Sequence, residues 1–194
     1  MASKVKVGVL ISGRGSNMSA LIAAAKAEDF PAEIALVIAN VADAGGLEAA
    51  RAEGVKAVAI ESKPFGQDRQ AHEQAMDAAL REAGVQVVCL AGFMRLLTPW
   101  FVDAWSGRML NIHPSLLPDF KGLHTHARAI AAGKEEAGCS VHVVTAELDD
   151  GPILGQARVR VLPGDTEDTL AARVLEEEHR LYPKCLAQFC RDLG

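Results

Sequence analysis

The chain has 194 residues, of which 49% are hydrophobic and 23% charged, and its formal net charge is −5. These values are typical of a globular protein with one large or two small domains, and no apolar run reaches the length of a membrane span. The composition therefore excludes a disordered or membrane-spanning chain, and the acidic balance argues mildly against a nucleic-acid-binding surface.

The cysteines and the amino terminus indicate the compartment. The four cysteines form no CxxC pair, and Cys89 lies inside an apolar run, which predicts a buried, reduced thiol. The amino terminus lacks a signal-peptide core and leads at once into a strand-like run. We therefore expect a cytoplasmic protein without a membrane partner.

The first half of the chain alternates between strand-like and helix-like stretches. The expected strands are 5–11, 34–39, 55–60 and 85–91, and the expected helices are 18–26, 43–52 and 68–83. In the last helix Met76 and Leu80 share the apolar face, Glu73 lies away from it, and His72 is expected to be solvated or to cap. Apolar strands that alternate with helices predict an α/β, Rossmann-like fold, a mainly parallel twisted sheet with helices on both faces.

The pattern changes in the second half. A strand at 108–113 is followed by a loop and a helix at 125–132, and two further strands are expected at 140–145 and 153–162. Their short connection predicts an antiparallel pair. A final helix begins near Asp165 or Thr166 and runs towards Cys190, with a break or kink at Pro183. No repeat or linker divides residues 1–194, which predicts a single domain.

A glycine-rich turn, Gly13-Arg14-Gly15-Ser16-Asn17, joins the first strand to the first helix. Two glycines permit a tight turn, and the free N–H groups of the following helix can bind a phosphate. The turn is neither a P-loop nor a dinucleotide fingerprint, because Met18 stands at the third glycine position and the second strand ends in Asn40. A mononucleotide or sugar phosphate fits better than a dinucleotide; the alternative is a simple glycine turn.

Asn111 and His113 end the strand at 108–113 and point to the same side of it. An amide donor beside a proton carrier suits a reaction in which a carbonyl oxygen gains negative charge. Asp149, from the loop between the last two strands, would stabilise a protonated imidazole. The alternatives are a histidine that only caps a sheet edge and an ordinary polar turn at 149–151.

The segment 91–99 follows the most apolar strand, where ligands of open α/β sheets bind. Its apolar side chains can line the site of a flat, partly aromatic ligand, although core packing explains Phe93 and Leu96 equally well. Three histidines fall between residues 113 and 126, but no HExxH or comparable spacing accompanies them, so no metal site is expected.

Taken together, these motifs resemble those of the phosphoribosylglycinamide formyltransferases, folate-dependent enzymes of purine biosynthesis. The resemblance covers almost the whole chain and rests on five segments in the same order: 10–17, 90–95, 110–118, 122–126 and 147–152. It implies transfer of a formyl group from 10-formyltetrahydrofolate, as co-substrate, to the amine of glycinamide ribonucleotide by direct attack. The implied partners are these two small molecules, with no nucleic acid, and a monomer and a homodimer remain equally open.

The resemblance also implies a half that binds the ribonucleotide phosphate, about 1–100, and a half that carries catalysis and the folate, about 101–194. The catalytic residues would be Asn111, His113 and Asp149. The ribonucleotide would be held by Gly15, Ser16, Asn17 and Glu178. The folate would be held by Arg69, Met94, Arg95, Leu96, Leu97, Asn111, Ala146, Glu147, Leu148, Asp149 and Asp150.

Two positions depart from the family pattern. Leu175 stands where relatives often have a lysine or glutamine that helps to hold the phosphate. Asp150 stands where relatives have a small residue, so either Asp149 or Asp150 can face His113, and the motif favours Asp149.

Three rivals share parts of this pattern. Formyltetrahydrofolate deformylases, which are hydrolases, have an additional amino-terminal domain, whereas here the first strand begins at Val5. Methionyl-tRNA formyltransferases add a basic tRNA-binding domain. A non-catalytic phosphate- or nucleotide-binding module would explain the glycine turn but not the three catalytic candidates.

Overall fold

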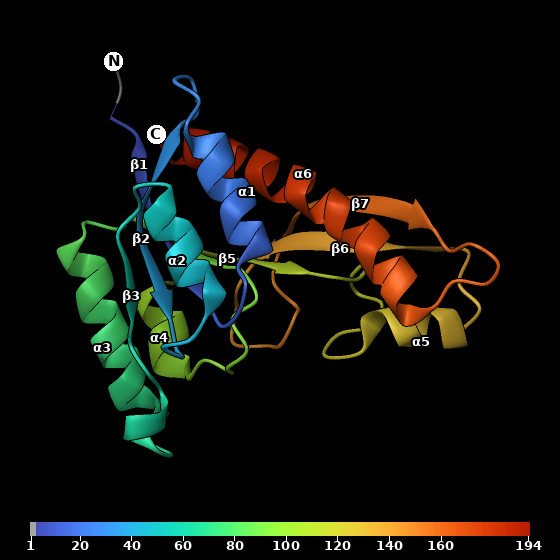
Figure 1. Cartoon of the computed structure of the whole chain (residues 1–194), viewed down its shortest axis with the longest axis horizontal. Helices are drawn as coiled ribbons and strands as arrows, with labels where there is room; N and C mark the ends of the chain where they lie inside the picture. Colours follow the sequence, from blue (N-terminus) through green and yellow to red (C-terminus); the bar gives the residue numbers. More distant parts are fainter. Residues whose placement is uncertain (1–2) are drawn as a thin grey trace.

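The computed structural model describes residues 3–194 (Figure 1). Within them, one seven-stranded sheet has the order β3-β2-β1-β4-β5-β6-β7. The strands are β1 Val5–Ile11, β2 Ala32–Ala39, β3 Ala57–Ala59, β4 Val87–Leu90, β5 Met109–His113, β6 Glu136–Val143 and β7 Ile153–Arg160. The helices are α1 Ser16–Ala25, α2 Gly45–Ala52, α3 Arg69–Glu82, α4 Pro99–Ala104, α5 Thr125–Ala131 and α6 Glu167–Leu193, with a 3₁₀ turn at Lys63–Phe65.

The sheet is parallel from β3 to β5 and antiparallel from β5 to β7. The expected Rossmann-like fold is therefore confirmed, with the antiparallel strands in the second half of the chain. The chain adds β2 and β3 on one side of β1 and then crosses over to add β4 and the later strands on the other side. Such a reversal opens a crevice beyond the carboxyl ends of the two central strands, where α/β proteins bind ligands.

Helices cover both faces of the sheet. One core cluster joins the sheet to α1, α2 and α6 through buried residues such as Leu21, Leu47 and Leu186. A second cluster, on the opposite face, includes Met76 of α3 and Trp105 at the end of α4. Helix α6 runs along most of the length of the molecule (Figure 1) and also contributes to a third cluster, which it shares with α5, β6 and β7.

Helix α3 corrects two predictions about polar residues. Met76 and Leu80 are fully buried, as their spacing predicts, but His72 and Glu73 are buried too. The Glu73 carboxylate accepts hydrogen bonds from the backbone N–H and the hydroxyl of Thr98, the residue that precedes α4. The His72 Nε2 donates to the Ile60 carbonyl at 2.7 Å. Helical periodicity could not reveal these partners, because they lie on separate segments.

Helix α6 and strand β6 also differ from expectation. The helix is capped by Thr166 and continues through Pro183 without a break, because the flanking Tyr182 and Leu186 are fully buried in the core. Strand β6 begins four residues before the predicted Ser140. A Cβ atom at Gly138 would lie only 2.0 Å from the Ala157 carbonyl oxygen, so a small, weakly strand-forming residue is what permits this pairing.

Candidate active site

A small pocket of about 190 Å³ lies beyond the ends of β1 and β4. We call it the glycine-loop pocket; it is lined by Gly13, Arg14, Gly15, Ser16, Asn17, Ala91 and Gly92. Gly15 immediately precedes α1 with φ of 69°, a left-handed conformation that glycine adopts without strain, and offers no side chain to cap the helix. The first N–H groups of α1 have no acceptor within the helix and can serve an anion.

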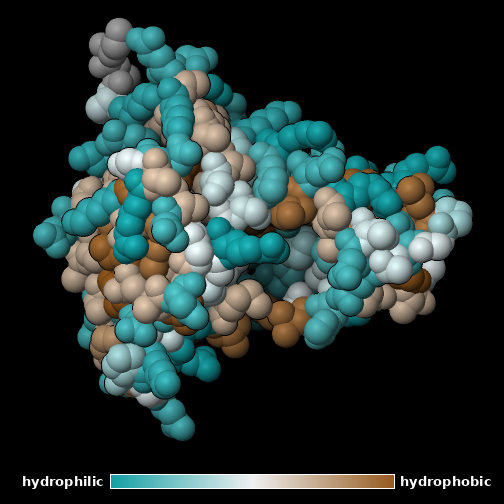
Figure 2. Space-filling model, in the orientation of Figure 1, coloured by the Kyte–Doolittle hydropathy of each residue, from teal (hydrophilic) through white to brown (hydrophobic). Residues whose placement is uncertain are grey.

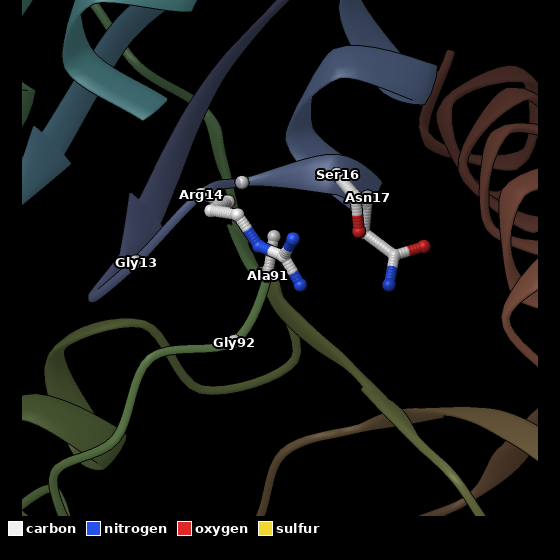
Figure 3. Close-up of a pocket in the computed structure, with 7 residues that line it drawn as sticks. Gly13, Arg14, Ser16, Asn17, Ala91 and Gly92 are labelled. Carbon is white, nitrogen blue, oxygen red and sulfur yellow. The ribbon is translucent and has the colours of Figure 1, made fainter. Parts of the chain in front are cut away.

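Arg14 gives this pocket its positive charge. Figure 3 shows the Arg14 and Asn17 side chains extending into the same space, beside the segment Ala91–Gly92. No ion pair found among residues 3–194 involves Arg14, so its guanidinium is available to a ligand. The Asn17 Oδ1 atom is buried and has no hydrogen-bond partner in the described part of the chain.

Glu178, on α6, lies beside Asn17. Its side chain is buried, and burial raises the pKa of the carboxyl to about 7, while hydrogen bonding by Asn17 opposes the shift. Near neutral pH this group can therefore either donate or accept a hydrogen bond. The Glu178 carboxyl can therefore form hydrogen bonds with hydroxyl or amine groups of a ligand.

One serine ties together the loops around the crevice. The Ser12 hydroxyl accepts a hydrogen bond from the Met94 backbone N–H at 2.8 Å and donates to Asn40 Oδ1 at 2.6 Å. These contacts join the ends of β1, β2 and β4. The glycine loop and the segment after β4 are thereby held next to each other.

A larger cleft of about 530 Å³ lies between the segment 93–97, the β5 strand and the loop that follows β6. Its walls are mainly apolar, and Met94, Leu96 and Leu148 at the cleft are 70%, 63% and 56% exposed. The volume lies within the range of small-molecule sites, and exposed apolar side chains suit a flat aromatic ring. Figure 2 shows a hollow near the middle of one face of the molecule, bordered by hydrophilic and hydrophobic residues.

His113, at the end of β5, is held from both sides of its ring. Its Nε2 lies 2.9 Å from the Phe120 carbonyl oxygen, which can only accept, so Nε2 carries a hydrogen. Its Nδ1 lies 3.5 Å from Oδ2 of Asp149. The Phe120 contact fixes the ring, and Nδ1 is left as the nitrogen that faces the carboxylate.

Asp149, rather than Asp150, faces His113. The Asp149 side chain is buried and accepts a hydrogen bond from the Gly122 backbone N–H at 2.9 Å, whereas Asp150 is exposed and pairs with Lys121. Asp149 and Phe120 have φ angles of 50° and 51°. Non-glycine residues held in this left-handed conformation cost about 1 kcal/mol or more each, and such strain concentrates at functional sites. Both strained residues contact the same imidazole.

Asn111 completes the group. It lies two residues before His113 on β5, and both side chains line the cleft. Its Nδ2 lies 3.3 Å from Nε2 of His142, which is directly opposite on β6. An amide donor, an imidazole and a carboxylate therefore meet at one wall of the cleft, an arrangement that can stabilise an oxyanion and move a proton.

The structure brings most of the predicted residues into these two places. The predicted folate residues that line the cleft are Met94, Arg95, Leu96, Leu97, Asn111, Ala146, Glu147, Leu148 and Asp149. Gly15, Ser16 and Asn17 line the glycine-loop pocket. Arg69, exposed at the start of α3, and Asp150 are not among the residues that line the cleft.

Three features of the site were missed from the sequence. The first is Arg14, which lies inside the glycine-rich turn and whose positive charge could have indicated a phosphate ligand. The second is His142, which lies inside a strand, where a buried core histidine is the ordinary interpretation, and it is buried, but it also lines the cleft. The third is the carbonyl oxygen of Phe120, a backbone atom, which residue type cannot reveal.

Neither a metal-binding cluster nor a membrane-spanning helix is present among residues 3–194. No three or more His, Cys, Asp or Glu side chains there are grouped so as to hold a metal ion. No helix in this range is sufficiently long and apolar to span a membrane.

Comparison with known proteins places these features in a family. The Formyl transferase family model matches residues 5–186. The phosphoribosylglycinamide formyltransferase of Escherichia coli (strain K12) is 46% identical over 185 residues, which are 95% of this chain and 87% of that protein. The trifunctional purine biosynthetic protein adenosine-3 of Gallus gallus is 47% identical over 95% of this chain, which spans only 18% of that protein's length.

Solved structures agree with these relatives. The crystal structure of phosphoribosylglycinamide formyltransferase from Brucella melitensis has a TM-score of 0.93 and 54% identity, covering 97% of this chain and 96% of that one. The glycinamide ribonucleotide transformylase 1 structure from Symbiobacterium toebii has a TM-score of 0.94 and 44% identity, covering 97% and 89%. Sequence and structure agree along nearly the whole chain, which belongs to the formyl transferase family.

Proposed function

We propose that this chain transfers the formyl group of 10-formyltetrahydrofolate to the amine of glycinamide ribonucleotide, a step of de novo purine biosynthesis. The observation that carries the proposal is the meeting of Asn111, His113 and Asp149 at the wall of a ligand-sized cleft. The near full-length similarity to bacterial phosphoribosylglycinamide formyltransferases supports the choice of substrates.

The two cavities suit the two substrates. The glycine-loop pocket offers backbone N–H groups and the Arg14 guanidinium to the phosphate of the ribonucleotide, and Glu178 can meet its hydroxyl or amine groups. The cleft offers apolar walls to the folate ring. Consecutive residues line the two cavities, since Ala91 and Gly92 line the glycine-loop pocket and Phe93 and Met94 line the cleft.

Asn111 and His113 would act on the carbonyl oxygen of the formyl group. As the amine attacks the formyl carbon, the C–O π electrons move to oxygen and a tetrahedral oxyanion forms. An Asn111 N–H can donate to it and the positive charge of a protonated His113 can stabilise it, and removing one such group typically costs about 3–4 kcal/mol of transition-state stabilisation. No enzyme nucleophile is needed.

Asp149 would hold the charge and help to move the proton. Its carboxylate faces His113 Nδ1 at 3.5 Å, so a proton at that nitrogen has an anionic partner. The attacking amine must lose a proton, and the folate nitrogen that leaves must gain one. Because the carboxylate lies no closer than 3.5 Å to His113 Nδ1, it can also orient a water molecule. This water can pass the proton from the attacking amine to the folate nitrogen that leaves.

The chain's four cysteines bear on its compartment. All four are buried and unpaired in the structure. Burial raises the pKa of Cys89 and Cys139 to about 12, so these thiols are protonated at neutral pH. Unpaired cysteines support our inference that the protein works in a reducing, cytoplasmic environment.

A direct assay separates this function from its rivals. Purified protein is mixed with 10-formyltetrahydrofolate, with and without glycinamide ribonucleotide, and both folate release and formylated ribonucleotide are measured. We expect release only when the ribonucleotide is present, with one formylated product for each folate released. Release without the ribonucleotide would instead identify a deformylase-like hydrolase, and no release in either case would favour a binding module.

A further inference from the structure

His142 is a buried imidazole in contact with Asn111 and Asp149, and the proposed reaction gives it no role of its own. It is 2% exposed and lies on β6 directly opposite Asn111 on β5. Residues paired in this way across an antiparallel ladder project from the same face of the sheet. The His142 ring therefore lies beside Asn111 at the wall of the cleft.

The hydrogen bonds of the ring select one tautomer. His142 Nδ1 lies 3.1 Å from the Val143 carbonyl oxygen, which can only accept, so Nδ1 carries the hydrogen. The Nε2 atom lies 3.3 Å from Nδ2 of Asn111, which can only donate. A neutral ring with its hydrogen on Nδ1 satisfies both contacts, because its Nε2 lone pair accepts from the amide.

The opposite orientation of the Asn111 amide fails in a neutral ring. If Oδ1 faced His142, Nε2 would need a hydrogen, and a bare Nδ1 would then face the Val143 carbonyl with two lone pairs opposed. Only a protonated imidazolium would satisfy that arrangement. Burial lowers the pKa of His142, although the Val143 carbonyl and the Asp149 carboxylate oppose the shift, so the ring is neutral near pH 7. The titratable groups that act on it are Asp149, after β6, and His113, on β5.

We propose that His142 is a positioning residue that fixes the orientation of the Asn111 amide, so that Asn111 presents an N–H and not a carbonyl oxygen to the reacting formyl group. One Nδ2 hydrogen is bound by His142, and the other remains for the cleft. A flipped amide would turn its oxygen towards the oxyanion and repel it. The inference rests on the proposed function, since it concerns the oxyanion of that reaction.

A second consequence concerns Asp149. His142 Nε2 lies 3.8 Å from Asp149 Oδ1, but a bare Nε2 brings no positive charge to the carboxylate. Asp149 therefore keeps its charge for His113, whose Nδ1 lies 3.5 Å from its other oxygen. Asp149 therefore lies between two histidines, and because His142 is neutral, the carboxylate pairs only with His113.

The test compares two substitutions in two backgrounds. His142→Leu removes the acceptor, and we expect kcat to fall between about 10- and 100-fold with both KM values changed less than about threefold. His142→Gln places an amide oxygen near the position of Nε2 and should restore kcat to within about fivefold of the unmodified protein. In an Asn111→Ala background, His142→Leu should change kcat less than about twofold, because its effect passes through Asn111.

Equal losses from His142→Leu in both backgrounds would overturn the inference, because a merely structural residue acts independently of Asn111. The tautomer is read separately from imidazole ¹⁵N chemical shifts of the unmodified protein, between about pH 6 and pH 9. A hydrogen on Nδ1 and a bare Nε2 are expected, and a hydrogen on Nε2 would overturn the inference. This measurement needs neither substrate nor variant, so it stands even if glycinamide ribonucleotide is not the acceptor or His142→Leu fails to fold.

Discussion

The glycine-loop pocket draws its polar groups from residues that follow one another in the chain, whereas the wall of the cleft collects them from β5, β6 and two loops. Gly13 to Asn17, from one turn and the start of α1, supply all of its lining except Ala91 and Gly92. The cleft needs His113 from β5, His142 from β6, Phe120 from one loop and Asp149 from another. A pocket built by local backbone geometry should tolerate side-chain changes, while a wall built from distant side chains should not.

The largest expected effect follows from His113→Ala at the wall of the cleft. This change removes the imidazole that we propose stabilises the oxyanion, and we expect kcat to fall about 1,000-fold, because a stabilising charge and a proton carrier are lost together. Steady-state formyl transfer measures the loss, and thermal unfolding checks that the variant is folded. A folded His113→Ala protein with near-normal kcat would contradict the assignment.

Glu178, beside the glycine-loop pocket, should change stability with pH. Its pKa is raised from 4.5 to about 7 in the folded protein, so the folded state binds the proton more tightly than the unfolded state. The resulting stabilisation is complete below about pH 4.5 and is lost as pH rises through about 7. Each pKa unit is worth 1.36 kcal/mol, so the change is on the order of 3 kcal/mol.

Glu178→Gln cannot titrate and should therefore remove this part of the pH dependence. Denaturant unfolding of both proteins between about pH 5 and pH 8 measures it. We expect the difference in unfolding free energy to shift in favour of Glu178→Gln as pH rises. A constant difference across this range would mean that the Glu178 carboxyl is not buried as described.

The two neighbouring aspartates provide a matched pair at the cleft. Asp149→Asn should lower kcat about 100-fold, because the proton on His113 loses its anionic partner. Asp150→Asn should change kcat less than about twofold, because an exposed ion pair such as Asp150–Lys121 contributes little. The same assay serves both variants. If Asp150→Asn were the more damaging change, the carboxylate that faces His113 would be misassigned.

Arg14→Gln tests the pocket and should have a smaller effect than Asp149→Asn. We expect the KM for glycinamide ribonucleotide to rise about tenfold while kcat changes little, because one charge-assisted contact to the phosphate is lost. The ribonucleoside without its phosphate should be used equally well by both proteins. Arg191→Gln, an exposed change of the same charge at the end of α6, is the matched control. Equal KM values for Arg14→Gln and the unmodified protein would remove Arg14 from the phosphate site.

The contrast between local and long-range contacts also explains which helices and strands could be predicted. The strand at 5–11 and the helix near 68–83 follow from the periodicity of their apolar residues, and both are present within one or two residues. Periodicity failed for Glu73, which is buried because the start of α4 supplies its hydrogen-bond donors. The break expected at Pro183 from the chemistry of proline is also absent, since α6 is continuous there.

The sequence by itself determined the alternation of strands and helices, the glycine turn that precedes α1, and the family to which the chain belongs. These properties depend on residue type and on spacing along the chain. Only the tertiary structure decided that Asp149 faces His113, that the Phe120 carbonyl fixes the ring, and that His142 lies beside Asn111. These contacts join backbone and side-chain atoms that are distant in the sequence, and their geometry exists only after β5, β6 and the two loops have packed together.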